Sequence, residues 1–325
     1  MLLQPRTISL GPPPWSGEEL ERAVLVNLNA VQSALQNHAG RGVAERLTSV
    51  TSALRLFNKT GTTILGQIER FHHEAHHNNL FRRNRRDDRQ RFEEELQEQL
   101  YVFAACSMTL VDQARSLTDK FHVPGYRERV TSTFSDSPRH RFIQELRVDM
   151  IHVTLHEPSW QLTSGADDNR KTRFLIHPEQ LRRAGEYHAL AKQFVANNPG
   201  GIDVASLVLV YSEEVNALHT WLRGAVEAAA SEILADLRRC RRIVAAVGSR
   251  TWWRLILSQV VIQGGRDPYA YLDQYLSPEE MWQVQSLPHR SKLQVDRIVE
   301  LVDDESACNA ELRELVYKAF GVRGT

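Results

Sequence analysis

Two side chains that could together act on a phosphate group lie near each other in the sequence, Arg147 and His152. Arginine offers a planar fork of donors that can hold a phosphate, and histidine can accept or release a proton near neutral pH. Such a pair could hold a phosphate and move a proton beside it. This chemistry uses no cofactor, and we expect none.

The string from Phe142 to His152, in which four residues separate the arginine from the histidine, resembles the R-x4-6-H signature of the HEPN superfamily. It also looks like strings in bacterial helical proteins of unknown function. HEPN proteins are all-helical and usually dimeric, and many are metal-independent ribonucleases of toxin–antitoxin and antiphage systems. The resemblance implies an endoribonuclease of bacterial defence or stress response, with Arg147 and His152 as its site. It further implies that Arg147 binds the scissile phosphate and that His152 acts as general base or acid, so that a ribose 2′-hydroxyl attacks its own phosphate. Val148 stands where the family favours Asn, Asp or His. Positions five apart lie about 140° apart on a helix, so a homodimer interface would have to reunite the pair.

The same predicted helix carries a second set of polar residues at spacings of four, three and four, which places them on one face. They are Glu145, Asp149, His152 and His156. We count Glu145 and Asp149 with the candidate catalytic residues, because carboxylates beside His152 would raise its pKa. The ridge could also hold a divalent metal. The alternative is a solvated polar face.

A histidine cluster follows Phe71, with His72 and His76 as one i,i+4 pair and His73 and His77 as another. Two imidazoles at this spacing on a helix can share a metal ion. Two ligands leave a site incomplete, so a third would come from another part of the chain, for example His122, His140 or His188. The alternative is a run of ordinary surface histidines at a helix end.

Arginines crowd the segment between Phe81 and Phe92. The candidate nucleic-acid contacts are Arg82, Arg83, Arg85, Arg86 and Arg89. Basic clusters hold RNA or DNA through phosphate contacts and counterion release. A second cluster surrounds Cys240 and consists of Arg238, Arg239, Arg241 and Arg242. Acidic residues follow the first cluster closely, so the alternative for both is a solvated helix surface with local ion pairs.

Composition and motif content argue against several classes of protein. Lysine plus arginine and aspartate plus glutamate both number 40, so no net charge draws the whole protein to a polyanion. The 3 cysteines fit neither a disulfide framework nor a cysteine-built zinc site, which favours a cytoplasmic protein. We expect no membrane span, because no apolar run is long enough. Glycine-rich phosphate loops and the common hydrolase motifs are absent from the sequence.

Hydrophobic periodicity predicts helices over most of the chain. We expect helices over 16–39, 43–77, 89–121 and 138–156, the second interrupted near Gly61. Alternating residues on either side of a polar turn predict one β-hairpin within 159–177. A helical pattern over 203–247 predicts one long helix, or two helices broken near Gly224, with Gly248 as the end.

These elements predict an all-α fold, a helical bundle with one long central helix, a β-hairpin insertion and a small helical carboxy-terminal lobe. We expect an extended arm over 1–15, the bundle over 16–247 and the lobe over 248–325. Trp252 and Trp253 are expected between lobe and long helix, or on a docking surface. The functional prediction is a HEPN-like ribonuclease with RNA as partner. The alternative is a non-catalytic scaffold that assembles with itself or with a protein partner.

Overall fold

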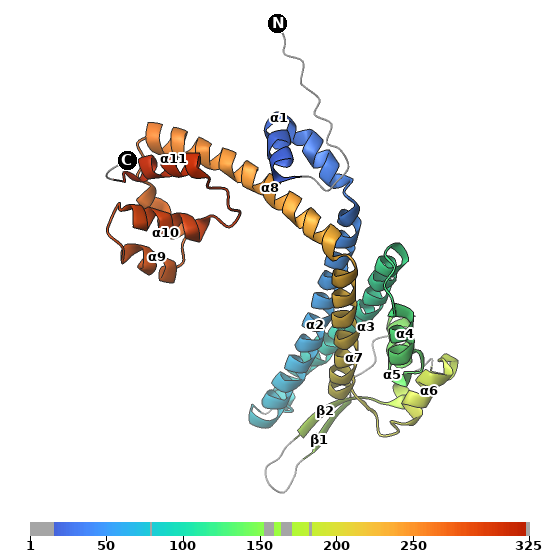
Figure 1. Ribbon diagram of the computed structural model, residues 1–325. Coiled ribbons are helices and arrows are strands. Elements are labelled where there is room, and N and C mark those ends of the chain that lie inside the picture. Colours follow the sequence, from blue (N-terminus) through green and yellow to red (C-terminus); the bar gives the residue numbers. More distant parts are fainter. Residues whose placement is uncertain (1–15, 79, 153–158, 164–170, 182–183, 323–325) are drawn as a thin grey trace. The chain divides into compact units, whose positions relative to one another are not determined.

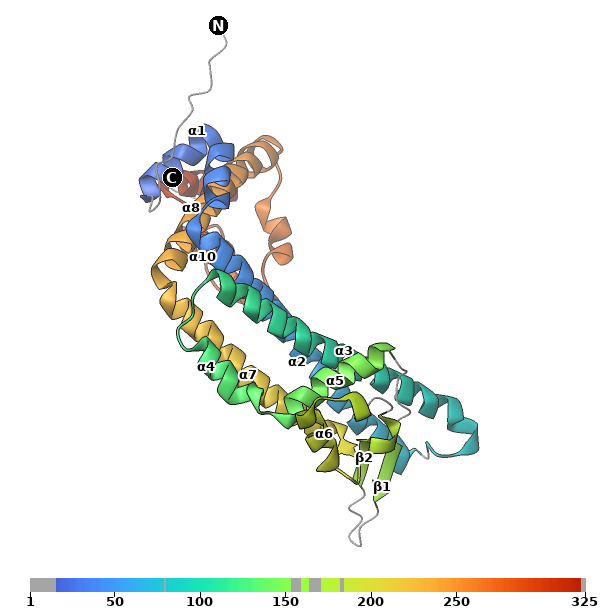
Figure 2. The same cartoon turned by 90° about the vertical axis from the view of Figure 1, so that its right-hand side faces the viewer.

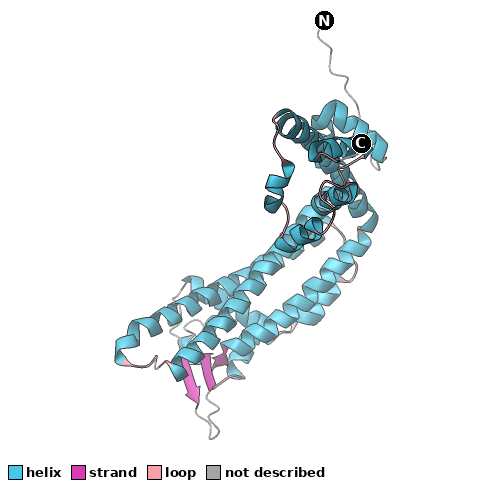
Figure 3. Cartoon of the chain, turned by 90° about the vertical axis from the view of Figure 1, so that its left-hand side faces the viewer, coloured by secondary structure: helices cyan, strands magenta, loops and turns pink. Residues whose placement is uncertain are grey.

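The computed structural model describes residues 16–78, 80–152, 159–163, 171–181 and 184–322. In this part of the chain the protein is all-α except for one small antiparallel sheet (Figures 1 and 3), as the sequence predicted. No described helix has both the length and the apolar character needed to cross a lipid bilayer. The expected arm, residues 1–15, lies outside the described residues.

The chain forms two compact units. Gly42–Ser231 form one, here named the bundle unit, and Met1–Arg41 with Glu232–Thr325 form the other, here named the terminal unit. The expected boundary at 247–248 falls inside a continuous helix, α8 (Ser231–Leu255).

Three long helices make the frame of the bundle unit and run side by side (Figures 1 and 2): α2 (Ala39–His77), α3 (Arg86–Lys120) and α7 (Val204–Ala229). Shorter elements complete it. They are η1 (Arg83–Arg85), α4 (Tyr126–Val130), the π-helical η2 (Thr131–Ser135), α5 (Pro138–His152), η3 (Pro178–Gln180), η4 (Ala184–Glu186) and α6 (Ala189–Ala196).

Aromatic rings from all three long helices meet in the core of the bundle unit. Phe57 of α2 stacks on Phe103 of α3 with ring centroids 4.7 Å apart, and Tyr211 of α7 meets Phe57 edge-on at 6.0 Å. All three side chains are almost fully buried. Burial of large rings contributes much of the stabilisation of such a core, so these contacts hold the three helices together.

The predicted hairpin is present as β1 (Ser159–Thr163) and β2 (Lys171–Ile176), antiparallel with Trp160 opposite Phe174. A short third strand that the sequence did not predict, β3 (Ile202–Asp203), pairs with β2. Asp203 also caps α7, because its side chain accepts from the backbone N–H of Ser206 at 3.1 Å. The sheet is therefore tied to the start of α7, at one end of the long helices (Figure 3).

Three predictions about helix ends were wrong. Gly61 does not interrupt α2, and the pattern over 203–247 divides at Ala230 rather than at Gly224. Gly248 does not end α8, which reaches Leu255. A single glycine costs a helix only about 1 kcal/mol, which packing readily outweighs.

The terminal unit contains two hydrophobic clusters. In the first, Leu20 and Val24 of α1 (Gly17–Gln36) pack against Cys240 and Val247 of α8. The second follows α8 and gathers apolar residues of the remaining elements. These are η5 (Ile256–Gln263), η6 (Pro268–Gln274), α9 (Pro278–Gln285), α10 (Lys292–Val302) and α11 (Ala310–Phe320). Trp253 packs against this second cluster, whereas Trp252 is exposed.

Candidate nucleic-acid interface

The arginine-rich segment forms the reversal between α2 and α3. α2 ends at His77, and buried Leu80 anchors the turn, its N–H donating to the Glu74 carbonyl at 3.2 Å. η1 then leads directly into α3 at Arg86. Acids in the first turn of α3 favour a helix start at this point, because they lie at the positive end of the helix dipole.

Arg85 is the residue that fixes this reversal. Its Nη1 donates to Glu74 Oε2 at 2.9 Å and to the Asn78 carbonyl at 3.0 Å, and its Nε donates to Asp88 Oδ2 at 2.9 Å. These acceptors come from both helices and from the turn itself. Arg85 therefore has a structural role at the reversal, and its nucleic-acid contact stays a prediction.

The arginines next to Arg85 in the sequence differ from it in exposure and in ion pairing. Arg82, Arg83 and Arg86, together named the arginine end, are exposed. Within the described part of the chain, none of the three lies within ion-pair distance of a carboxylate; the local pairs involve Arg85 and Arg89 instead. The local ion pairs of the alternative are thus present at Arg85 and Arg89, whereas the described residues provide none for the arginine end, which is solvated.

An aromatic ring lies beside the arginine end. The Phe81 side chain is 42% exposed, and the Arg89 guanidinium lies 5.7 Å from its ring centroid. Arg89 also approaches Glu93, at 3.8 Å. Beneath them, Phe71 meets Phe81 edge-on, with centroids 6.0 Å apart, and stacks on Trp160 of β1. The ring of Phe81 is thus held in place by a buried neighbour while part of it faces solvent.

The two histidine pairs of α2 have different surroundings. His72 Nδ1 and His76 Nε2 both reach the hydroxyl Oγ1 of Thr172 on β2, at 3.1 and 2.9 Å. His73 and His77 are exposed, with ring centroids 5.0 Å apart. Thr172 lies 100 positions beyond His72, so the sequence held no signal for this contact.

Among the described residues, no three His, Cys, Asp or Glu side chains come close enough together to hold a metal ion. Two of the proposed third ligands have other partners. His140 lies 3.0 Å from Tyr211 Oη, and His188 caps α6 by accepting from the Leu190 N–H at 3.3 Å. Each histidine pair thus offers two nitrogen ligands here, and a zinc site normally takes three or four protein ligands.

The acidic residues of α5 attach it to the chain that follows. Glu145 Oε1 accepts from the backbone N–H of His188 at 3.1 Å. Asp149 is 0% exposed and accepts a hydrogen bond from the Tyr187 hydroxyl. The solvated-face alternative is therefore wrong for Asp149. Both carboxylates position the segment before α6.

Arg147 remains on α5 with its Nε buried and without a hydrogen-bond partner among the described residues. The backbone of α5 includes His152, but the His152 side chain lies outside the described residues, as does His156. The described structure therefore leaves the predicted convergence of Arg147 and His152 as a prediction.

Comparison of the chain with protein-family models, with curated proteins and with solved structures finds no significant match.

Proposed function

We propose that the protein binds RNA through the arginine end of the bundle unit. The observation that carries this proposal is that one arginine, Arg85, builds the reversal, while Arg82, Arg83 and Arg86 around it are exposed without a carboxylate partner in the described chain. Exposed guanidinium groups on a fixed backbone are suited to phosphates, which they hold in a bidentate way.

Phe81 directs the proposal toward single-stranded RNA. Unpaired bases stack on aromatic side chains, whereas the grooves of a duplex do not present a base face. The half-exposed ring, fixed by Phe71 and flanked by Arg89, offers one such surface beside the cations. We expect one base to stack on Phe81 while the phosphates on either side contact the arginine end.

The test is binding of a fluorescently labelled single-stranded RNA, followed by anisotropy in about 150 mM salt. Losing three phosphate contacts should weaken binding about 50-fold and lower the salt dependence of log K by about 2. The variant is Arg82→Gln/Arg83→Gln/Arg86→Gln. The matched control, Arg238→Gln/Arg241→Gln/Arg242→Gln, removes the same charge from exposed residues of the terminal unit.

Equal losses in the two triple variants would show a general charge effect and contradict a site at the arginine end. Phe81→Ala should weaken RNA binding about 5- to 50-fold without changing the salt dependence, since stacking involves no counterion release. A single-stranded DNA of the same sequence shows whether the ribose contributes.

RNA cleavage at Arg147 and His152 is a second candidate function. The observation that favours it is the Arg147 Nε, a buried donor for which the described chain offers no acceptor. Buried donors are normally paired, so a phosphate oxygen would complete the site. His152→Ala should abolish cleavage of a labelled RNA pool, with binding at the arginine end retained. Absence of cleavage by the wild type would contradict this second function and leave RNA binding as the proposed activity.

A further inference from the structure

A cavity of about 490 Å³ opens on one face of the small sheet in the bundle unit. Gln161 of β1 and Arg173 of β2 lie opposite each other in the strand register, and both line the cavity. Side chains alternate between the two faces of a strand, so this face is opposite to the one with Trp160 and Phe174, which pack against the core. A volume of this size is typical of sites for small molecules.

Two guanidinium groups from different elements reach this cavity. Arg139, in the first turn of α5, donates from Nη1 to Glu214 Oε1 at 2.5 Å. Arg173 Nε lies 3.7 Å from Asp203 Oδ2, an ion pair without a hydrogen bond. A guanidinium carries five N–H donors. The described residues provide no further acceptor for either arginine, so each keeps donors for a ligand.

The cavity also offers an aromatic ring and a polar group beside it. Phe194 of α6 lines the cavity and stacks on buried Phe142, with ring centroids 5.1 Å apart. Asn198 Nδ2 donates to the Phe194 carbonyl at 2.7 Å, which leaves the Asn198 Oδ1 as an acceptor at the cavity. Nucleobases stack on aromatic side chains and form hydrogen bonds through their edges. These residues therefore suit a flat, polar-edged ring.

The charge of the lining favours an anion. Asp203 is the one acidic residue among the described residues that line this cavity, and its Oδ1 is held as the cap of α7 by the Ser206 N–H at 3.1 Å. Arg139 and Arg173 together outweigh it, so the lining has a net positive charge. The sheet, α6 and the start of α7 lie together at this end of the bundle unit (Figure 2).

We infer that this cavity binds a nucleoside monophosphate, with the phosphate on Arg139 and Arg173 and the base beside Phe194. Guanidinium groups hold phosphate oxygens through pairs of charge-assisted hydrogen bonds. The inference does not rest on the proposed RNA binding, because none of the cavity residues belongs to the arginine end.

The experiment is isothermal titration calorimetry of the full chain with the 5′-monophosphates of adenosine, guanosine, cytidine and uridine. We expect at least one of them to bind. Its nucleoside, which lacks the phosphate, should bind about 10-fold or more weakly, because the charge-assisted hydrogen bonds are lost. Absence of binding by all four nucleotides, or equal affinity for nucleotide and nucleoside, would overturn the inference.

Two variants should change the affinity in opposite directions. Arg173→Gln should weaken nucleotide binding about 10-fold. Asp203→Asn should tighten it about 3-fold, because a negative charge leaves the lining while asparagine still caps α7. Structural damage would weaken binding in both. Arg127→Gln, at an exposed position of α4, is the matched control and should bind as the wild type does.

Unchanged affinity in Arg173→Gln, or weaker binding in Asp203→Asn, would overturn the inference. The triple variant of the arginine end should bind the nucleotide as the wild type does. Failure of RNA binding would refute the proposed function and leave the nucleotide site standing, so the two proposals fail separately.

Discussion

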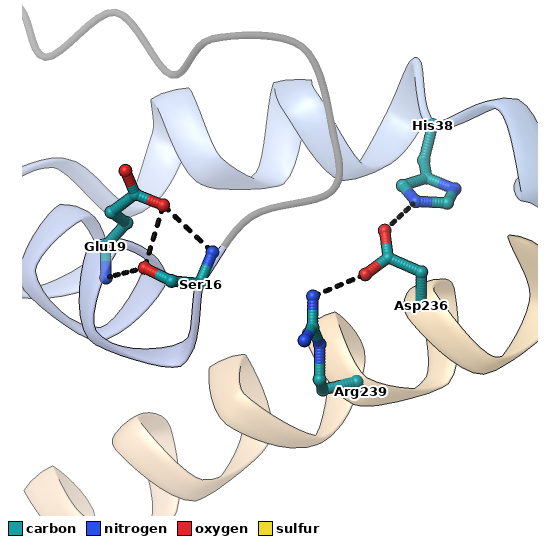
Figure 4. A network of polar contacts seen from close by, with 5 residues as sticks. All are labelled: Ser16, Glu19, His38, Asp236 and Arg239. Carbon is teal, nitrogen blue, oxygen red and sulfur yellow. Dashed lines mark hydrogen bonds and ion pairs between the residues drawn. The ribbon is translucent and has the colours of Figure 1, made fainter. Parts of the chain in front are cut away.

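The two units differ in the partners that they provide for buried histidine side chains. In the terminal unit, His38 is 4% exposed and has partners for both ring nitrogens. The Gly40 N–H donates to Nδ1 at 3.0 Å, so the ring hydrogen is on Nε2, which donates to Asp236 Oδ2 at 3.1 Å. Asp236 Oδ1 accepts in turn from Arg239 Nη2 at 2.6 Å (Figure 4). This chain of bonds fastens the α1–α2 junction to α8.

In the bundle unit, buried histidines lack a carboxylate partner among the described residues. Gln144 is oriented by Arg141, so its N–H donates to His140 Nε2 at 3.0 Å, and His140 Nδ1 faces Tyr211 Oη. His219 is 5% exposed, and its Nδ1 has no hydrogen-bond partner in the described structure. Protonation would place a charge in a site built for a neutral ring.

The arginine clusters show a related contrast. Arg239 on α8 pairs with Asp236, whereas Arg85 at the reversal pairs with both Glu74 and Asp88 and also donates to the Asn78 carbonyl. At the reversal, arginines without a carboxylate partner among the described residues adjoin the exposed ring of Phe81, which is held by Phe71. Residue type alone therefore does not predict the role of a histidine or an arginine in this protein. That role depends on the number and kind of partners that the folded chain brings to the side chain.

The largest expected effect is loss of stability in acid. Burial lowers the pKa of His219 to about 4, and burial with the charges of Arg141 and Arg115 lowers that of His140 to about 4, from 6.5. Between these values the unfolded chain binds protons that the folded protein does not, so the free energy of unfolding falls as the pH falls from 6.5 to 4. Each group contributes about 3 kcal/mol to that loss.

Urea unfolding of the wild type and of His219→Leu at pH 7.5 and pH 4.5 checks this. The variant should lose markedly less stability between the two pH values, whereas His122→Leu, at an exposed position, should match the wild type. Equal losses in all three proteins would show that buried histidines do not govern the response.

The second largest effect is expected from loss of the hydrogen bond between His38 and Asp236 in the terminal unit. Asp236→Ala leaves the His38 N–H buried without its acceptor, which should cost about 2 kcal/mol. Thermal unfolding monitors the change, and Asp304→Ala, at an exposed position of the same unit, serves as control. A loss no larger than that of the control would mean that the bond to His38 contributes nothing measurable.

The third effect concerns Gly40, where the backbone of α2 lies close to the backbone of α8. A Cβ on Gly40 would lie 2.8 Å from the backbone oxygen of Ile233, so Gly40→Ala should cost about 1 to 2 kcal/mol. Gly66, in the same helix, has open space at its Cβ position, so Gly66→Ala should stabilise the protein by up to about 1 kcal/mol. Opposite signs in thermal unfolding are the expected result; equal signs would contradict the close packing of α2 and α8 at this point.

The smallest effect compares the two paired arginines. Arg85→Gln should destabilise the protein slightly more than Arg239→Gln does, because the Arg85 side chain is 28% exposed and joins two helices, whereas that of Arg239 is 51% exposed. Chemical unfolding of Arg85→Gln and Arg239→Gln measures the difference. Arg85→Gln should also weaken RNA binding beyond the loss of one charge, since the reversal that presents its neighbours loosens. RNA binding weakened no more than in Arg239→Gln would contradict that role.

Local sequence patterns were enough to predict most of the helices and strands. Apolar periodicity marked α3, alternation around a polar turn marked β1 and β2, and Ser16 with Glu19 marked the start of α1, where a reciprocal capping box forms (Figure 4). These signals are read within a few residues, and caps and hairpins are stabilised over the same distance. Gly61 failed as a break because α2 packs there against Phe103 and Val208.

The sequence by itself determined an all-α protein with a hairpin and located its clusters of arginine and histidine. Only the tertiary structure decided that Arg85 is bound while its neighbours are exposed, and that Asp149 is buried against Tyr187. It also decided that His72 meets Thr172 while His73 faces solvent. The physical reason is that a polar side chain's charge and exposure depend on partners brought from distant positions, and neither spacing nor composition records which of those partners arrive.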